Sequence, residues 1–149
     1  MIQIKNTQRK IKINEANIKK IVQNILNYLN YRDYDIGIWF TTNQTIRNYN
    51  KTYRNKDKAT DILSFPFHTN LKAGSRIKPA SDDDKNLGDM IISLEYTQQE
   101  AKKLNVSLDV RIKTLLIHGI CHLLGYDHKT VTDYEKMHTK EKEVLKITD

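Results

Sequence analysis

The chain has 149 residues, of which 38% are apolar and 29% charged, and its 25 Lys and Arg against 18 Asp and Glu give a net charge of +7. This length is typical of one domain with a working core, and the basic charge favours polyanionic partners. A lone cysteine, Cys121, excludes a disulfide-stapled scaffold, and no apolar run is long enough for a signal peptide or a membrane span. We therefore expect a cytoplasmic protein with no membrane partner.

The N-terminal elements are predicted from the spacing of apolar residues. Isoleucines alternate with polar residues at 2–4 and again at 11–13, which predicts two short strands or one interrupted strand. Apolar residues three and four apart over 18–29 predict an amphipathic helix, which Asn14 can cap. The β-branched and aromatic residues over 35–41 predict the next strand.

The middle of the chain contains a second helix, a strand and a long loop. Thr42 or Asn43 can cap the helix. The strand is predicted over 61–67, where Pro66 favours a strand end or a sheet edge. Residues 69–85 have no periodicity and include an acidic run, so we expect a long exposed loop there.

The last part of the chain predicts one strand and three helices. The strand covers 87–92, and helices follow over 93–104 and 107–124, each starting with a serine that can cap it. Gly125 fits the position just past the end of the second of these helices. The final helix is predicted over 132–146, with a capping box at its start.

The order of these elements indicates the fold class. Strands and helices intermix without strict alternation, and neither a fixed-period repeat nor a linker divides the chain. We expect a single α+β domain over 1–149, with a mixed sheet of about four strands packed with helices. The most informative side chains then lie on one helix and the turn that follows it.

Three of the five histidines lie within eleven residues around that helix end. His118 and His122 are four apart, so they share one helix face, and Gly125 can reverse the chain to bring His128 back. Three neutral imidazoles with a fourth position open are typical of a catalytic zinc site, where a bound water has a pKa of about 7. The alternative is that they are ordinary surface or core histidines, which is common for an isolated pair.

The same histidine spacing occurs in metzincin proteases, which place a glutamate directly after the first histidine as general base. This chain has Gly119 there, which opposes peptide hydrolysis. Cys121 is rotated off the histidine face, and we interpret it as a packing residue. Asp127 is either an acceptor that orients an imidazole or a turn residue, and the sequence does not decide between these roles.

A basic segment follows the second predicted strand. Its cations are Arg47, Lys51, Arg54, Lys56 and Lys58. Tyr49 and Tyr53 are interleaved with them, and such a mixture suits phosphates and unpaired bases. The segment is equally compatible with a solvated helix face whose tyrosines pack inward. An arginine has a further use, because its planar fork can hold a phosphate and offset charge that builds up during hydrolysis.

Three stretches of the chain resemble the YbeY family of bacterial endoribonucleases and rRNA maturation factors. The first runs from His118 to His128 and reads HGICHLLGYDH. The second, over 53–66, reads YRNKDKATDILSFP, and the third, over 87–93, reads LGDMIIS. Their order and the chain length also fit, so the resemblance extends over essentially the whole chain. Cys121 departs from the family, which usually has leucine there.

The resemblance implies a zinc-dependent endoribonuclease with one Zn²⁺ held by His118, His122 and His128. It further implies cleavage of single-stranded RNA, maturation of the 3′ end of 16S rRNA and ribosome quality control in the cytoplasm. The expected partners are the small ribosomal subunit and other ribosome-associated factors. The functional arginine of the family falls on Arg54.

Three hypotheses follow from the residues and the resemblance together. In the leading one, a zinc-bound water or hydroxide acts as nucleophile or base, Arg54 binds the scissile phosphate, and Lys51, Lys56 and Lys58 guide the RNA backbone. The second is a small metallopeptidase, which the histidine spacing favours and Gly119 opposes. The third is a ribosome-associated RNA-binding protein whose zinc is structural, in which case chelation would unfold the domain.

Overall fold

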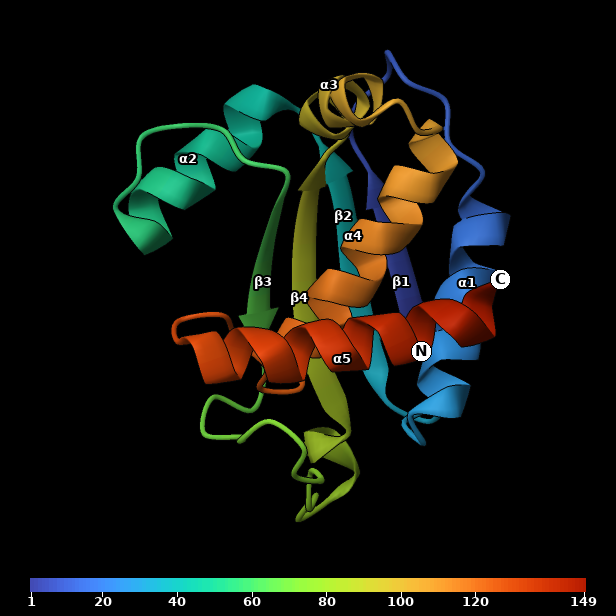
Figure 1. Cartoon of the computed structure of the whole chain (residues 1–149), viewed down its shortest axis with the longest axis vertical. Helices are drawn as coiled ribbons and strands as arrows, with labels where there is room; N and C mark the ends of the chain where they lie inside the picture. Colours follow the sequence, from blue (N-terminus) through green and yellow to red (C-terminus); the bar gives the residue numbers. More distant parts are fainter.

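The computed structural model describes residues 1–149 and contains one four-stranded sheet and five α-helices (Figure 1). The strands are β1 (Ile2–Asn6), β2 (Asp35–Thr41), β3 (Ile62–Pro66) and β4 (Asn86–Ser93). The helices are α1 (Glu15–Tyr28), α2 (Asn43–Arg54), α3 (Leu94–Leu104), α4 (Leu108–Leu123) and α5 (Val131–Thr148). None of these helices is both long and apolar enough to cross a membrane. The single α+β domain with a mixed four-stranded sheet confirms the predicted fold class.

The strand order in the sheet is β1-β2-β4-β3. β1, β2 and β4 run parallel, whereas β3 is antiparallel to β4 and forms one edge. Pro66 ends this edge strand, as predicted, because a residue without an N–H group is tolerated where no ladder hydrogen bond is required. Because β3 pairs only with β4, its other side forms the edge at which the two faces of the sheet meet.

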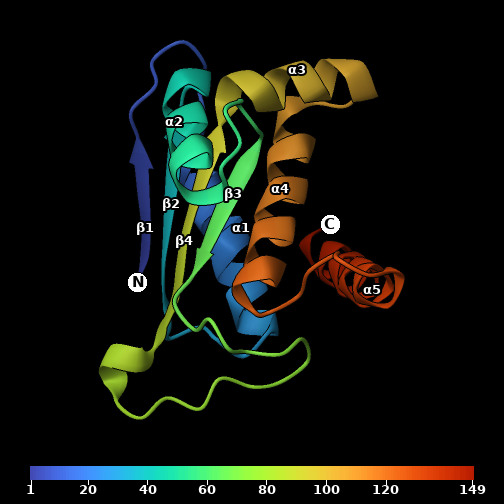
Figure 2. The same cartoon turned by 90° about the vertical axis from the view of Figure 1, so that its left-hand side faces the viewer.

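The two faces of the sheet are covered unequally (Figure 2). Ile62 and Ile92 point into the larger core with α1 and α4, and α5 packs outside these two helices. Leu63 and Ile91 point the other way, into a small core with Ile46 of α2. Alternation along β3 and β4 thus places α4 and α2 on opposite faces.

Helix caps account for most of the element boundaries. Asn14, Thr42, Ser93 and Ser107 each accept a hydrogen bond from a backbone N–H in the first turn of the helix that follows. These caps satisfy donors that have no partner within the helix. The strand over 35–41 also has the predicted bounds.

One predicted strand is absent, and the start of one predicted helix is shifted. Residues 11–13 form no strand, because the Gln8 side-chain amide pairs with the backbone of Ile11 in place of a neighbouring strand, at 2.7 Å to its oxygen and 2.9 Å from its nitrogen. The residue that caps the last helix is Thr130, two residues before the predicted Thr132, and it accepts a hydrogen bond from the Asp133 N–H at 3.1 Å.

The long connection over 69–85 is less exposed than predicted. Ile77 is buried, and its N–H donates to the Tyr31 hydroxyl at 3.1 Å. Arg76 lies over the Tyr31 ring and donates to the carbonyls of Leu29 and Asn30 at the end of α1. An apolar anchor and a cation that satisfies free helix carbonyls therefore hold this segment against the domain.

Candidate metal centre

α4 positions the first two histidines of the site. Half of its residues are buried, and Gly119 faces the sheet, where an added Cβ would overlap the Met90 sulfur and approach the Ile62 side chain. The missing side chain lets the helix approach β3 and β4 closely. His118 and His122 are half-buried, one turn apart on a neighbouring face of α4.

The end of α4 returns the chain toward these two histidines. Gly125 has φ +93°, and its N–H bonds the His122 carbonyl at 3.0 Å while the Tyr126 N–H bonds the Cys121 carbonyl at 3.1 Å. This pair of bonds is a Schellman motif, which requires a left-handed residue at the glycine position. A Cβ at Gly125 would also overlap the Leu71 carbonyl. The turn brings the exposed His128 to the same side as the helical pair.

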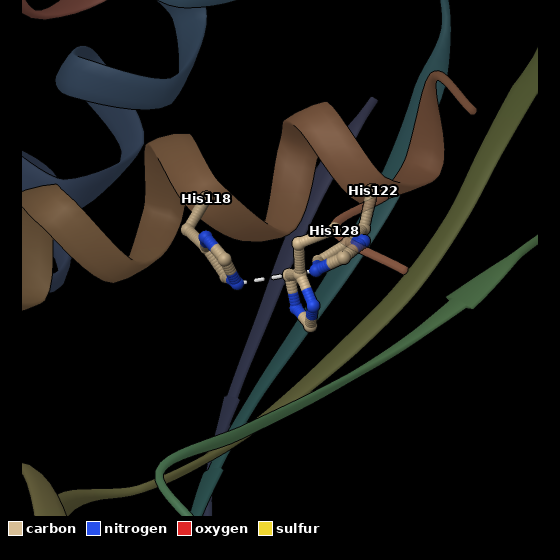
Figure 3. A group of neighbouring side chains, drawn as sticks. All are labelled: His118, His122 and His128. Carbon is tan, nitrogen blue, oxygen red and sulfur yellow. Dashed lines mark hydrogen bonds between the residues drawn. The ribbon is translucent and has the colours of Figure 1, made fainter. Parts of the chain in front are cut away.

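The three imidazoles converge on one point (Figure 3). One ring nitrogen from each of His118, His122 and His128 lies within 4.8 Å of the others. The Nε2 atoms of His118 and His122 are 3.1 Å apart. Two nitrogens bound to one tetrahedral ion at 2.0–2.1 Å are separated by about 3.3 Å. The spacing of the helical pair therefore fits a shared metal ion.

Hydrogen bonds to the far side of the His118 and His122 rings fix which nitrogen of each is free. His118 Nδ1 lies 2.9 Å from Glu141 Oε2, and His122 Nδ1 lies 2.9 Å from the Tyr126 carbonyl oxygen. Both partners are acceptors, so both Nδ1 atoms carry the proton. The two Nε2 lone pairs then face each other, which is repulsive unless a cation lies between them. This arrangement fits a metal better than it fits an ordinary histidine cluster.

Burial keeps the imidazole of His122 neutral. Desolvation, and then the neighbouring His118, lower the pKa of His122 from its ordinary 6.5 to about 4. At pH 7 its Nε2 therefore presents a lone pair rather than a proton. Only a neutral imidazole binds a metal ion, so His122 is ready to bind one at neutral pH.

Glu141 is a site residue that the sequence did not indicate. It lies on α5, 23 residues after His118, on a helix to which the sequence assigns no part of the site. Asp127 does not orient an imidazole: its Oδ1 accepts from the Lys129 N–H at 3.2 Å. The structure therefore favours the turn role for Asp127, and the orienting acceptors are Glu141 and the Tyr126 carbonyl.

Cys121 does not contribute to the metal centre. Its side chain is 1% exposed within the main core. Burial raises the pKa of the thiol to about 12, so the thiolate form that binds metals is not available at neutral pH. These observations agree with its interpretation as a packing residue.

The basic segment lies across the β3 edge from the histidines. Arg54 ends α2, is exposed, and makes no hydrogen bond or ion pair. Arg47 pairs with Asp57 at 2.8 Å, and Lys51 lies 4.0 Å from the same carboxylate. The predicted Lys56 and Lys58 follow in the loop that leads to β3, and both are exposed. Arg54 is therefore a free guanidinium, and no protein contact joins it to the imidazoles.

The chain is similar to named proteins of one family along most of its length. The model of the family described as endoribonuclease YbeY matches residues 3–149. A human protein named endoribonuclease YbeY is 39% identical over 142 residues, which cover 95% of this chain and 84% of that protein. A namesake from Aquifex aeolicus is 38% identical over 128 residues, covering 86% of this chain and 79% of the relative.

A solved structure is similar in fold. The solution structure of a Thermotoga maritima protein has a TM-score of 0.61 and 22% identity, covering 98% of this chain and 90% of that one. At this identity the likeness supports the architecture alone. The family match, which spans nearly the whole chain and includes the histidine and arginine segments, shows that the protein belongs to the YbeY endoribonuclease family.

Proposed function

We propose that residues 1–149 act as one metal-dependent endoribonuclease domain that cuts single-stranded RNA. The observation that carries the proposal is the convergence of three imidazoles whose helical pair presents two Nε2 lone pairs to one point. The relatives named endoribonuclease support RNA as the substrate, and the net charge of +7 suits a polyanion.

The proposed metal is one Zn²⁺ ion held by His118, His122 and His128. When bound there, the ion would activate a water molecule and withdraw charge from the phosphate. Glu141 and the Tyr126 carbonyl hold the first two rings in the binding orientation through their Nδ1–H groups. The exposed His128 completes the set from the turn after α4.

Arg54 is the proposed phosphate ligand. Its guanidinium has no protein partner, so it is free to hold two phosphate oxygens and to offset charge that develops on them. Lys51, Lys56 and Lys58 flank it on the exposed side of α2 and the following loop, where they can guide the RNA backbone. Since β3 separates Arg54 from the imidazoles, the scissile phosphate must lie at this sheet edge, between the guanidinium and the imidazoles.

The proposed biological substrate is the 3′ end of 16S rRNA. The motif resemblance supports roles in its maturation and in ribosome quality control, in the cytoplasm, with the small ribosomal subunit and ribosome-associated factors as partners. A peptidase is disfavoured, because a glutamate at position 119 would have no room beside Met90 and Ile62.

The test combines cleavage, metal content and folding. A labelled single-stranded RNA and its duplex are incubated with the zinc-loaded protein, the chelated protein and the His122→Ala variant. We expect cleavage of the single strand only, loss of cleavage on chelation, and retained helical circular dichroism. Full cleavage by metal-free His122→Ala protein would refute the proposal. Unfolding on chelation without any turnover would support a structural zinc instead.

A further inference from the structure

The sheet face opposite the metal centre carries a groove that no helix fills. α2 packs near the β3 edge of this face, whereas α1, α4 and α5 lie on the other side (Figure 2). The groove has a volume of about 410 Å³. The side chains that matter for the argument are Lys5, Trp39, Tyr49, Tyr53, Phe65 and Asp89.

Four aromatic rings from three elements form a continuous wall of this groove. Trp39 of β2 meets Tyr49 edge-on at 5.5 Å, and Tyr49 stacks on Tyr53 at 5.9 Å, both from α2. Tyr53 in turn meets Phe65 of β3 at 5.4 Å. Tyr53 is 64% exposed, and the other three rings are only partly buried. Mutual contacts hold the rings in place, and Tyr53 is the ring that stays largely open to solvent.

One cation borders the aromatic wall, and a second lies next to it in the sequence. Lys5 Nζ lies 4.4 Å from the centre of the Trp39 ring, and the free guanidinium of Arg54 follows directly after Tyr53. Asp89 is the only acid in the groove lining. Its carboxylate lies where a side chain on Gly37 would be, so the missing side chain of Gly37 makes room for it. A carboxylate at this position can accept a hydrogen bond from the amino group of a base.

We propose that this groove binds unpaired bases of single-stranded RNA, which rests on the proposed endoribonuclease function. Aromatic faces stack on any base, and flanking cations neutralise the phosphates between them. β3 connects the two sites, because Phe65 faces the groove whereas Ile62 faces α4. An RNA strand held in the groove then reaches the β3 edge, where its scissile phosphate lies between Arg54 and the imidazoles.

The test uses Trp39, which is the only tryptophan in the chain. The full-length His122→Ala variant, in which we expect cleavage to be lost, is titrated with a ten-nucleotide oligo(U) RNA while tryptophan fluorescence is followed. Zinc-loaded wild-type protein is measured in parallel by rapid mixing. We expect saturable quenching by the RNA, and none by inorganic polyphosphate, because polyphosphate supplies charge without bases.

Substitutions locate the quenching site. Tyr53→Ala should weaken RNA binding by about tenfold, since it removes one stacking face, and Tyr53→Phe should restore it. The matched control is Tyr28→Ala, because Tyr28 is also exposed but lies on α1, and its binding should equal that of the parent. Equal quenching by polyphosphate, or unchanged binding by Tyr53→Ala, would overturn the proposal. So would a groove that binds a lysine- and arginine-rich peptide but no RNA.

Cleavage is measured separately, so failure of the two proposals can be distinguished. RNA binding that depends on Tyr53, with no turnover in the zinc-loaded wild-type protein, would support RNA binding in the groove and reject the endoribonuclease function. Turnover that is insensitive to Tyr53→Ala, together with unchanged binding, would reject the groove alone.

Discussion

The metal centre and the aromatic groove lie on opposite faces of one sheet, and they are assembled in different ways. The three imidazoles come from eleven consecutive residues on α4 and its terminal turn. The groove draws its side chains from β1, β2, α2, β3 and β4. The geometry of the first site therefore follows from helix spacing and one glycine turn, whereas the second exists only once the sheet is assembled. Substitutions on one face should leave the other face intact.

The strongest test of this separation is loss of a metal ligand. His122→Ala should lower RNA cleavage by about a thousandfold or more, because the charge stabilisation that a metal supplies is worth several kcal/mol. Steady-state cleavage assays with metal analysis check this. Quenching of Trp39 by RNA should persist in this variant, and its loss would indicate that the two faces are coupled.

Substitutions at Arg54 test the same separation from the other face: they should change cleavage but not metal binding. Arg54→Ala should lower kcat by about a hundredfold, because one donor to the developing charge is removed. Arg54→Lys should recover only part of this, since lysine keeps the charge but loses the fork. Zinc affinity, measured by competition with a chelating dye, should not change. A decrease in zinc affinity would show that Arg54 supports the metal centre instead.

Glu141 should affect metal binding more than any other residue outside the three histidines. Glu141→Gln should weaken zinc binding by about 10- to 100-fold, because the carboxylate that orients His118 is lost. Glu143→Gln is the matched control on the same helix, since Glu143 contacts Tyr28 and Lys140 and no histidine. Equal zinc affinity in the two variants would show that Glu141 does not support metal binding.

A substitution at Gly125 tests the turn that brings His128 back to His118 and His122. Gly125→Ala should lower the free energy of unfolding by about 1–3 kcal/mol, because alanine resists a φ of +93° and its Cβ would overlap the Leu71 carbonyl. Urea unfolding measures this change. Gly74 also has a positive φ but has open space around it, so Gly74→Ala should cost less.

The smallest expected effect is a dependence of stability on pH in the metal-free protein. The pKa of His122 is about 4 when folded and 6.5 ordinarily, so between these values the unfolded chain binds a proton that the folded chain does not. Stability should be complete above pH 6.5 and fall by about 1–2 kcal/mol as the pH decreases to 4. Urea unfolding at several pH values checks this, and His122→Ala should lose the dependence.

Local signals in the sequence predicted most of the fold and the three converging histidines. Asn14, Ser93 and Ser107 cap the helices that they were expected to cap, because a cap requires only its own first turn. The strand over 11–13 was wrong for a related reason: alternation indicates an extended chain but not whether a partner strand is available. Here Gln8 satisfies that backbone instead.

Features that depend on tertiary contacts were not visible in the sequence. Glu141 reaches His118 only because α5 crosses over α4, and its own helix gives no sign of this. Tyr49 and Tyr53 were noted beside cations, but whether they pack inward or line a surface depends on the position of Trp39 and Phe65. The missing information is therefore the arrangement of elements that are far apart along the chain.

The most direct measurement is zinc X-ray absorption of the purified full-length protein, together with its metal content. We expect one ion per chain with three imidazole nitrogens at about 2.0–2.1 Å and one further light atom from solvent. A sulfur neighbour at about 2.3 Å, four imidazole-like ligands, or no stoichiometric ion would contradict an open site built from His118, His122 and His128.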